Sequence, residues 1–369
     1  MLYLLILFLI LLLAFCILVK KKDVHNLLTS FITGKFTEGR TLFTAPNIVA
    51  LGGGTGLSTL LSGLKLYTRN ITAIVAVTDE GGSSGRIRQE WGMLPPGDIR
   101  NCIVALAEND NSLNRLLNFR FDRGELKGHS LGNLILLATT EMVGDFYQAV
   151  KELNKLLAIR GQVLPSTVES VTLKGETKSG EEVTGELDIS KHGAELHRLW
   201  LDPVSAKPVK EAMDSIDKAD IIVLGPGSLF TSVLPNILLE DLSKKIRLSG
   251  VPVVYVANLL TQPKETDGMN IVAHVDWIVS LLGKMPDYVV ANQTVIPEEI
   301  FKAYKKIGSE PLCMSQKEER YLTSLGCKII YGDFVAINDK GHVRHNIQNL
   351  SKAVVEIAAV EASHKKKGI

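Results

Sequence analysis

Cysteine is scarce in this sequence, and its four cysteines lie far apart. Cys16, Cys102, Cys313 and Cys327 form no CxxC pair, so neither a disulfide framework nor a zinc signature is present. A reducing compartment fits this usage best. Because free cysteine usually behaves as a small buried hydrophobe, we expect the three cysteines outside the first segment to be buried.

An excess of either charge is missing as well. Lys and Arg total 41 and Asp and Glu total 40, which gives a formal charge of +1. This balance leaves no global electrostatic footprint for nucleic acid, and we expect no nucleic-acid partner. Any binding of anions must therefore be local. The 369 residues suffice for one large domain or two smaller ones with a substantial core.

The common catalytic motifs are absent too. The sequence contains no Gx4GK[ST] element, serine elbow, HExxH motif or protein-kinase motif set, which removes the usual ATPase, hydrolase and metalloprotease classes. The sequence also offers no recognisable combination of a general acid, a general base and a nucleophile. We therefore predict no catalytic residue, no metal ligand and no required cofactor.

Charge is missing in particular from the first nineteen residues. Met1 to Val19 carry no charged side chain and are followed by Lys20 to Lys22, a length close to the ~20 residues that a spanning helix needs. A secretory signal would have basic residues before the apolar run and a small-residue cleavage site, and both are lacking. The lysines place the rest of the chain in the cytoplasm. We predict a transmembrane anchor at 1–22, a juxtamembrane linker at 23–45 and a folded domain at 46–363.

Short apolar runs alternate with helical patterns in the folded domain. Asn47 to Leu51 leads into a glycine-rich turn, and leucines at helical spacing follow from Leu57 to Leu64 before a second run at Ile71 to Val77. This is a βαβ unit, which implies parallel strands and a right-handed crossover. The same alternation returns at Asp220 to Leu224 and Val251 to Val256. Since the carboxyl ends of parallel strands form the ligand crevice, we expect the polar residues that follow these strands to converge on one site.

A small insertion is expected between the two halves. Val168 to Leu173 and Val183 to Ile189 flank Lys178-Ser179-Gly180, which predicts a β-hairpin.

The strongest ligand motif is the glycine loop of Gly52, Gly53, Gly54, Thr55 and Gly56. Glycines let the backbone approach a ligand closely, and the amides at the start of the following helix favour an anion such as phosphate. The loop departs from the dinucleotide fingerprint because the third glycine is missing. A tight structural turn is the alternative interpretation.

A second group of small polar residues follows the Ile71 to Val77 run. Asp79 lies where ribose-binding acids lie in dinucleotide folds, although a solvated carboxylate is the alternative. Glycines, Ser83, Ser84 and Arg86 come next, and such a cluster can wrap a diphosphate or a sugar.

Two further helix starts carry polar residues. Pro95-Pro96-Gly97-Asp98 predicts a helix with Asp98 as N-cap and with Arg100 and Asn101 in its first turn. An arginine there opposes the helix dipole, which favours an anionic partner. In the cluster from Gly128 to Asn133, His129 is equally consistent with a structural hydrogen bond and with a catalytic base. Gly225, Gly227 and Ser228 form a third ligand-type loop.

Several sequence blocks together resemble one family. GGGTGLSTLL, TAIVAVTDEGGSSGRIR, GMLPPGDIRNC, GHSLGN, VLPST, LGPGSLFTSVLPN and NLLTQPKETDG are similar to the YvcK/CofD superfamily, and specifically to the branch called gluconeogenesis factor. The blocks occur in order from about Asn47 to about Val360. The resemblance implies a Rossmann-like, doubly wound α/β fold with a parallel sheet, in agreement with the βαβ units.

The resemblance implies two candidate functions. CofD transfers a phospholactyl group from a guanosine nucleotide to a deazaflavin and uses a paired-aspartate loop with a divalent metal. The YvcK branch binds UDP-sugars such as UDP-N-acetylglucosamine and supports cell-wall synthesis and cell shape during growth on gluconeogenic carbon sources. GGSSGR and PPGDIRN are typical of the YvcK branch.

The sequence departs from the family pattern at two places. Asp79-Glu80 stands where relatives usually have two aspartates, and Lys264 stands where they usually have glycine before Glu-Thr-Asp. The extra methylene of Glu80 moves an oxygen by about an ångström, whereas metal coordination distances are held within roughly 0.2 Å. This argues against metal-dependent transfer.

The resemblance also implies further binding residues. Tyr304 and Arg344 fall in C-terminal segments that contribute to sugar-nucleotide binding in the family. Tyr304 can stack on the base, with helix packing as its alternative role, and Arg344 can pair with diphosphate oxygens. Asn258 and Thr261 complete the predicted ligand-binding set.

We therefore expect a UDP-sugar-binding regulatory protein rather than an enzyme, because nucleotide-binding features abound while a catalytic set is lacking. A CofD-like transferase is the first alternative, and an NAD(P)-dependent oxidoreductase, which rests on fold analogy, is the second. The sequence leaves open the identity of the sugar, homo-oligomerisation and the partners in cell-wall synthesis.

Overall fold

The computed structural model describes residues 45–108 and 111–367. The predicted anchor at 1–22 lies outside the described residues, as does the predicted linker up to residue 44. Among the described residues no helix has both the length and the apolar character needed to cross a membrane.

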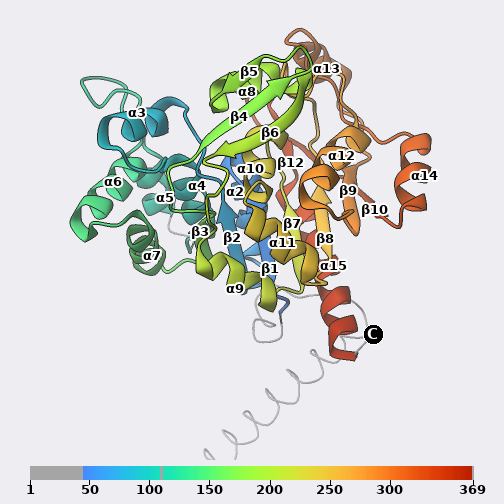
Figure 1. The fold of residues 1–369 in the computed structure, drawn as a ribbon, viewed down its shortest axis with the longest axis horizontal. Coiled ribbons are helices and arrows are strands. Elements are labelled where there is room, and N and C mark those ends of the chain that lie inside the picture. Colours follow the sequence, from blue (N-terminus) through green and yellow to red (C-terminus); the bar gives the residue numbers. More distant parts are fainter. Residues whose placement is uncertain (1–44, 109–110, 368–369) are drawn as a thin grey trace, which may run out of the picture. The chain divides into compact units, whose positions relative to one another are not determined.

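A seven-stranded parallel sheet forms the centre of the described chain (Figure 1). Its order is β10-β9-β8-β7-β1-β2-β3, and each neighbouring pair is parallel. The strands are β1 (Ile48–Gly52), β2 (Ile71–Val75), β3 (Gln162–Pro165), β7 (Ile221–Leu224), β8 (Val253–Val256), β9 (Tyr288–Asn292) and β10 (Lys328–Gly332).

The central strands are apolar because both faces of the sheet are covered. Every residue of β1, β2, β7 and β8 is buried, and such continuous Val/Ile/Leu runs are typical of parallel strands between helices. The predicted βαβ unit at the start of the domain is confirmed, since β1 pairs in parallel with β2 and α2 (Gly54–Leu64) connects them.

Helices pack on both faces of the sheet, as the doubly wound α/β interpretation predicts. Leu57, Leu60, Leu61 and Leu64 of α2 are fully buried, so the helical spacing read from the sequence marks its core face. The helices beside α2 are α4 (Gly97–Leu106), α7 (Phe146–Leu156) and α15 (Ile347–Lys367). The other group comprises α9 (Lys210–Lys218), α10 (Leu234–Ile237), α11 (Glu240–Leu248), α12 (Ile271–Leu282) and α14 (Gln316–Ser324).

The predicted hairpin is present and belongs to a small three-stranded sheet of order β5-β4-β6. We call this insertion the β4–β6 subdomain; it consists of β4 (Thr172–Thr177), β5 (Glu182–Thr184), α8 (Glu186–His192), a 3-10 turn (Gly193–Glu195) and β6 (Leu196–Asp202). The strand expected over Val183 to Ile189 is wrong in its second half. Gly185 ends the extended run at φ +90°, and the chain turns into α8.

The remaining elements surround this framework. One group packs around α4 and α7 and consists of α3 (Gly82–Trp91), α5 (Asn111–Asn118) and α6 (Leu131–Val143). The C-terminal part adds α13 (Glu298–Lys305) and an antiparallel pair of β11 (Val335–Ile337) and β12 (Val343–His345). Of the cysteines expected to be buried, Cys102 and Cys327 are, whereas Cys313 is exposed.

The strand order changes direction at β1. From β1 the chain proceeds to β2 and β3 on one side, and after the β4–β6 subdomain it returns to β7 on the other side. In open α/β sheets a ligand crevice forms outside the carboxyl ends of the strands at such a switch point. The fold therefore predicts a site between the loops that follow β1 and β7.

Candidate functional site

A cavity of about 580 Å³ lies at this switch point. The loops after β1, β7 and β8 line it, together with α8 of the β4–β6 subdomain and segments near Tyr304 and Arg344. Its volume is within the range of small-molecule sites. The sequence-based expectation that polar residues after several strands converge on one site is confirmed for these loops.

The glycine loop forms the wall of the cavity next to β1. Gly53, Gly54, Thr55 and Gly56 all line the cavity. Gly53, the N-cap residue of α2, has no side chain that could cap the first-turn amides, of which the Gly54 amide donates to the Asp98 side chain. That first turn also contains no acidic residue. Because free helix N-terminal amides favour an anion, this wall is suited to phosphate oxygens.

The glycine loop touches the loop after β7. A Cβ atom at Gly56 would lie 2.4 Å from the backbone oxygen of Pro226, so only glycine allows this approach. Gly227 and Ser228 line the cavity beside Pro226, and the Gly227 amide donates to Asn258 Oδ1 at 3.3 Å. The carboxamide after β8 thus fixes the loop after β7.

The C-terminal segments around Tyr304 and Arg344 form the side of the cavity opposite the glycine loop. The amide of Val343 donates to the Tyr304 hydroxyl at 2.9 Å, which ties β12 to α13. The Tyr304 ring is half-buried, packs against the core and lines the cavity. The helix-packing role is thus present, whereas stacking on a base stays a prediction. Arg344 is exposed and is the only Arg or Lys among the cavity-lining residues described. Thr261 Oγ1 accepts from the Glu310 amide at 2.9 Å and so holds this side in place.

Three carboxyl groups line the same cavity. Burial, with the Asp79 carboxylate as the next contribution, raises the pKa of Asp98 to about 7 and the pKa of Glu186 to about 8. Burial also raises the pKa of Glu265, which accepts from the Phe230 amide at 3.1 Å and from Ser228. Asp98 and Glu186 are therefore partly protonated near neutral pH, so the cavity is less negative than its composition suggests.

The predicted N-cap role of Asp98 is wrong. Pro96 caps α4, and Asp98 lies one residue inside its first turn. Its side chain instead accepts a hydrogen bond from the Gly54 amide. The carboxyl group therefore connects α4 to the glycine loop rather than capping its own helix.

The Gly128 to Asn133 cluster and Ser83 form a buried polar network away from the cavity lining. Asn133 Nδ2 donates to Ser83 Oγ at 3.0 Å, which leaves the Ser83 hydroxyl hydrogen to donate to His129 Nδ1 at 2.9 Å. Burial, with Arg86 as the next contribution, lowers the pKa of His129. A neutral, buried histidine held in this way has the structural role of the two weighed from the sequence.

Arg100 belongs to the same network. It is buried, and its guanidinium donates to Asn133 Oδ1 at 3.3 Å and to Asn118. The place of Arg100 in the first turn of α4 predicts an anionic partner, but its guanidinium hydrogen-bonds to neutral groups. Two carboxamides satisfy it instead, which fixes α4 against α5 and α6.

The other predicted residues lie around the cavity without lining it. Ser84 Oγ accepts from the Gly97 amide at 3.1 Å, and Arg86 donates to the Lys127 carbonyl at 2.9 Å. The cluster that contains them is the first turn of α3 rather than a loop. The predicted residues absent from the lining are Gly52, Asp79, Ser83, Ser84, Arg86, Arg100, Asn101, His129, Asn133 and Gly225.

The position of Lys264 has a backbone explanation. Its φ is +69°, a left-handed value that favours glycine and costs other residues roughly 1–2 kcal/mol. This fits the glycine usual in the family at that place. Lys264 is exposed, and its side chain is not part of the cavity lining, whereas its carbonyl accepts from the Ala194 amide of the β4–β6 subdomain at 3.2 Å.

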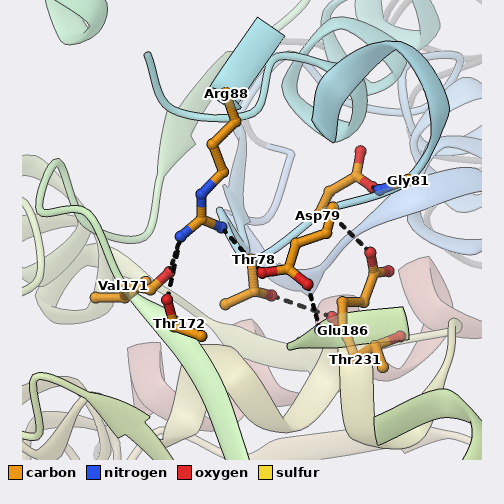
Figure 2. A network of polar contacts seen from close by, with 9 residues as sticks. Thr78, Asp79, Gly81, Arg88, Val171, Thr172, Glu186 and Thr231 are labelled. Atoms are coloured by element: carbon orange, nitrogen blue, oxygen red, sulfur yellow. Dashed lines mark hydrogen bonds and ion pairs between the residues drawn. The ribbon is translucent and has the colours of Figure 1, made fainter. Parts of the chain in front are cut away.

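The adjacent acids Asp79 and Glu80 accept hydrogen bonds from two different backbone amides. Asp79 Oδ1 accepts from the Gly81 amide at 2.9 Å (Figure 2), and the Glu80 carboxylate accepts from the Glu186 amide at 3.0 Å. Across the part of the chain that is described, no group of three or more His, Cys, Asp or Glu side chains is arranged to hold a metal ion.

Sequence reasoning missed the contribution of the β4–β6 subdomain. Glu186 and Ser190 of α8 line the cavity, but this stretch reads as a strand from its sequence and lies far from the glycine motifs. Gln262, Ser309 and His345 were missed as well, although each lies within a few residues of a predicted position. Proximity in sequence to Thr261, Tyr304 and Arg344 is the signal that could have found them.

Comparison with known proteins agrees with this geometry. Residues 48–335 match the family model described as 2-phospho-L-lactate transferase CofD. Two relatives are named gluconeogenesis factor: one from Halalkalibacterium halodurans, 43% identical over 312 residues (84% of this chain, 96% of the relative), and one from Bacillus subtilis, 40% identical over 314 residues (85% and 98%). The chain belongs to the CofD family, in its YvcK branch. The crystal structure of a UPF0052 family member from Bacillus halodurans is 42% identical with a TM-score of 0.80, and the match covers 84% of this chain and 99% of that one.

The family match includes most of the segments that line the cavity. The match extends across both loops at the switch point and ends at β11, before Arg344. The match to the similar crystal structure covers 84% of this chain, which supports the α/β architecture. Neither comparison names a ligand for this chain.

Proposed function

We propose that the cavity binds a nucleotide diphosphate sugar of the UDP-N-acetylglucosamine type and that the protein acts as a regulatory binding factor. One observation carries the proposal. The first turn of α2, which has no capping side chain at Gly53, and the pair Tyr304 and Arg344 line one cavity although they lie at opposite ends of the domain's sequence. An anion site and an aromatic with an arginine are the elements that a nucleotide diphosphate requires.

The ligand's parts can be assigned to the walls of the cavity. The diphosphate lies against the amides and the Thr55 hydroxyl, with Arg344 as a charge-assisted second contact. The base stacks on the Tyr304 ring. Asn258, Ser228 and Thr261 offer hydrogen-bonding groups on the cavity lining, which suits the hydroxyl groups of a sugar.

The protonated carboxyl groups favour this assignment at neutral pH. Asp98 and Glu186, with pKa values of about 7 and about 8, are largely neutral acids below these values and donate hydrogen bonds to ligand oxygens. When ionised they would repel a diphosphate.

The regulatory role draws on the names of the relatives and on the YvcK resemblance. Relatives called gluconeogenesis factor support a function in growth on gluconeogenic carbon sources, with cell-wall synthesis and cell shape as the processes served. The apolar first segment supports attachment to the inner face of the plasma membrane. An alkaline-phosphatase fusion after Ile369 should be inactive in that topology, and an active fusion would contradict it.

A CofD-like phospholactate transferase is the second candidate, and the matched family description favours it. Against it stands the engagement of Glu80 with Glu186 and Arg88, which removes an adjacent acid pair from the metal role that the transferase uses. An NAD(P)-dependent oxidoreductase ranks third because the glycine loop lacks the third glycine of the dinucleotide fingerprint.

Titration calorimetry on the full-length chain tests the proposal. UDP-N-acetylglucosamine should bind at micromolar concentration, and GDP, NAD and NADP should bind more weakly. Chromatography after overnight incubation should recover the sugar nucleotide unchanged. Tighter binding of GDP together with phospholactyl transfer to a deazaflavin would move the protein to the transferase class, and absence of UDP-sugar binding would remove the proposal.

A further inference from the structure

Glu80 joins two parts of the fold that are remote in sequence. It lies in the loop between β2 and α3, and its carboxylate reaches the start of α8 in the β4–β6 subdomain. The family usually has an aspartate in its place. The longer side chain of Glu80 makes contacts with α8, and none of the ligand-binding residues named so far makes the same contacts.

Glu80 and Glu186 exchange hydrogen bonds reciprocally. The Glu186 amide donates to Glu80 Oε2 at 3.0 Å, and the Glu80 amide donates to Glu186 Oε2 at 2.8 Å. Each carboxyl group thus satisfies the backbone of the other residue, 106 positions away in the chain. Such reciprocal pairing fixes both the distance and the orientation of two segments.

The backbone before α8 is shaped to receive this side chain. Gly185 has φ +90°, and a Cβ atom there would lie 2.3 Å from Glu80 Oε2. The backbone conformation favours glycine, and the missing Cβ leaves room for the Glu80 carboxylate. Glu80 therefore occupies the space beside the Gly185 backbone that a larger residue would fill.

Arg88 connects the same contact to the subdomain sheet. Its Nη2 donates to the Val171 carbonyl at 2.7 Å, next to the start of β4. Its Nη1 lies 3.9 Å from Glu80 Oε1, an ion-pair distance too long for a hydrogen bond, and has no hydrogen-bond partner. The positive charge of Arg88 thereby compensates the negative charge of the half-buried Glu80 carboxylate. Its Nη2 at the same time binds the backbone next to β4.

We infer that Glu80 is a positioning residue that holds α8 as a wall of the ligand cavity. Glu186 and Ser190 of α8 line that cavity, while Glu80 itself does not. The inference rests on the proposed binding function for its consequence, because a displaced α8 would open the cavity on the side that Glu186 and Ser190 form. Its structural part, the attachment of α8, stands independently of any ligand.

Hydrogen exchange on the full-length chain tests the attachment directly. Glu80→Asp shortens the side chain by one methylene, so the Glu186 amide loses its acceptor, and exchange across Glu186 to Ser190 should become roughly tenfold faster. Glu80→Gln keeps the length and one oxygen acceptor and should restore protection to near the wild-type rate. Glu90→Asp, an exposed change in the same helix α3, is the matched control and should exchange as the wild type does.

Calorimetry with UDP-N-acetylglucosamine on the same proteins tests the consequence. Glu80→Asp should raise Kd roughly threefold to tenfold, with Glu80→Gln and Glu90→Asp near the wild type. Wild-type exchange of α8 in Glu80→Asp would overturn the inference, as would weaker binding without faster exchange, because Glu80 would then act on the ligand directly. If the wild type binds no UDP-sugar, the proposed function fails, while the exchange rates still decide whether Glu80 holds α8.

Discussion

Two clusters of glycines and small polar residues look alike in this sequence and do different things in the structure. The glycine loop at Gly53 to Gly56 lines the cavity at the switch point of the sheet. The cluster around Ser83, His129 and Asn133 forms a buried network in which the Ser83 hydroxyl, His129 Nδ1 and the Asn133 carboxamide have protein partners. Composition alone does not separate them.

Their positions in the fold separate them. The glycine loop follows β1, where the strand order reverses, so its amides face a crevice that the fold leaves open. Ser83 and Asn133 lie in the first turns of α3 and α6, which pack against each other, and their side chains are buried. A polar cluster binds a ligand where its hydrogen bonds remain free, and it stabilises the fold where they are already made.

The largest loss of affinity for a UDP-sugar is expected from Gly56→Ala. The new Cβ would lie 2.4 Å from the Pro226 carbonyl oxygen, which forces the two cavity loops apart. Overpacking costs ~1–3 kcal/mol, so binding should weaken by up to roughly a hundredfold. Calorimetry measures the affinity, and circular dichroism checks the fold. Wild-type affinity in a folded variant would show that the loops do not hold the ligand.

Removal of the two proposed phosphate contacts should have a smaller effect. Arg344→Ala and Thr55→Ala each delete one hydrogen-bonding group on the cavity lining, and a charge-assisted hydrogen bond is worth ~1.5–3 kcal/mol, so each should weaken binding roughly tenfold or more. Lys340→Ala, which removes an exposed cation between β11 and β12, is the control for a general charge effect. Equal losses in Lys340→Ala and Arg344→Ala would remove the specific role of Arg344.

A pH dependence of a few-fold is expected next. The folded-state pKa values of Asp98 (about 7) and Glu186 (about 8) lie above their unfolded values near 4, so the folded state binds more protons. Their contribution to stability is therefore present below pH 4 and is lost as pH rises through 7 and 8. Affinity for a diphosphate should fall over the same window as the carboxylates ionise.

Asp98→Asn is the variant that sharpens this pH prediction. The carboxamide keeps an acceptor for the Gly54 amide and carries no charge at any pH, so both stability and affinity should change less between pH 6 and pH 9 than in the wild type. Thermal melts and calorimetry at the two pH values measure these changes. An unaltered pH profile in Asp98→Asn would assign the dependence to other groups.

The smallest effect on affinity is expected from Ser83→Ala. Loss of the hydroxyl leaves Asn133 Nδ2 and His129 Nδ1 without the partner that each has in the buried network, which costs ~1–3 kcal/mol of folding free energy. Affinity for the UDP-sugar should stay within about twofold of the wild type. Denaturant unfolding and calorimetry compare the two quantities. A tenfold loss of affinity with unchanged stability would make the network part of the binding site.

The cavity wall formed by the glycine loop is well predicted from the sequence because the signals for it are local. The apolar run before Gly52, the leucines at helical spacing after it and the rule for carboxyl ends of parallel strands suffice to predict β1, α2 and the place of the cavity. The wall made by α8 depends on long-range contacts, above all the pairing of Glu80 with Glu186. The change from strand to helix at Gly185 is likewise set by that tertiary contact.

Hydrogen-bond partners decide what the local pattern leaves open. Asp98 reads as an N-cap from its position after Pro96 and Gly97, but its side chain is bonded to Gly54 across the fold. His129 was open between a structural and a catalytic role until Ser83 appeared as its neighbour. These assignments need the packing of helices that are distant in sequence.

A crystal structure of the chain with UDP-N-acetylglucosamine tests the central claim most directly. The account predicts one ligand at the switch point, with its diphosphate oxygens within hydrogen-bond distance of the first-turn amides of α2 and of Arg344, and with the uracil ring against Tyr304. A ligand bound instead at the Ser83 and His129 network, or a cavity left without ligand at saturating concentration, would contradict it.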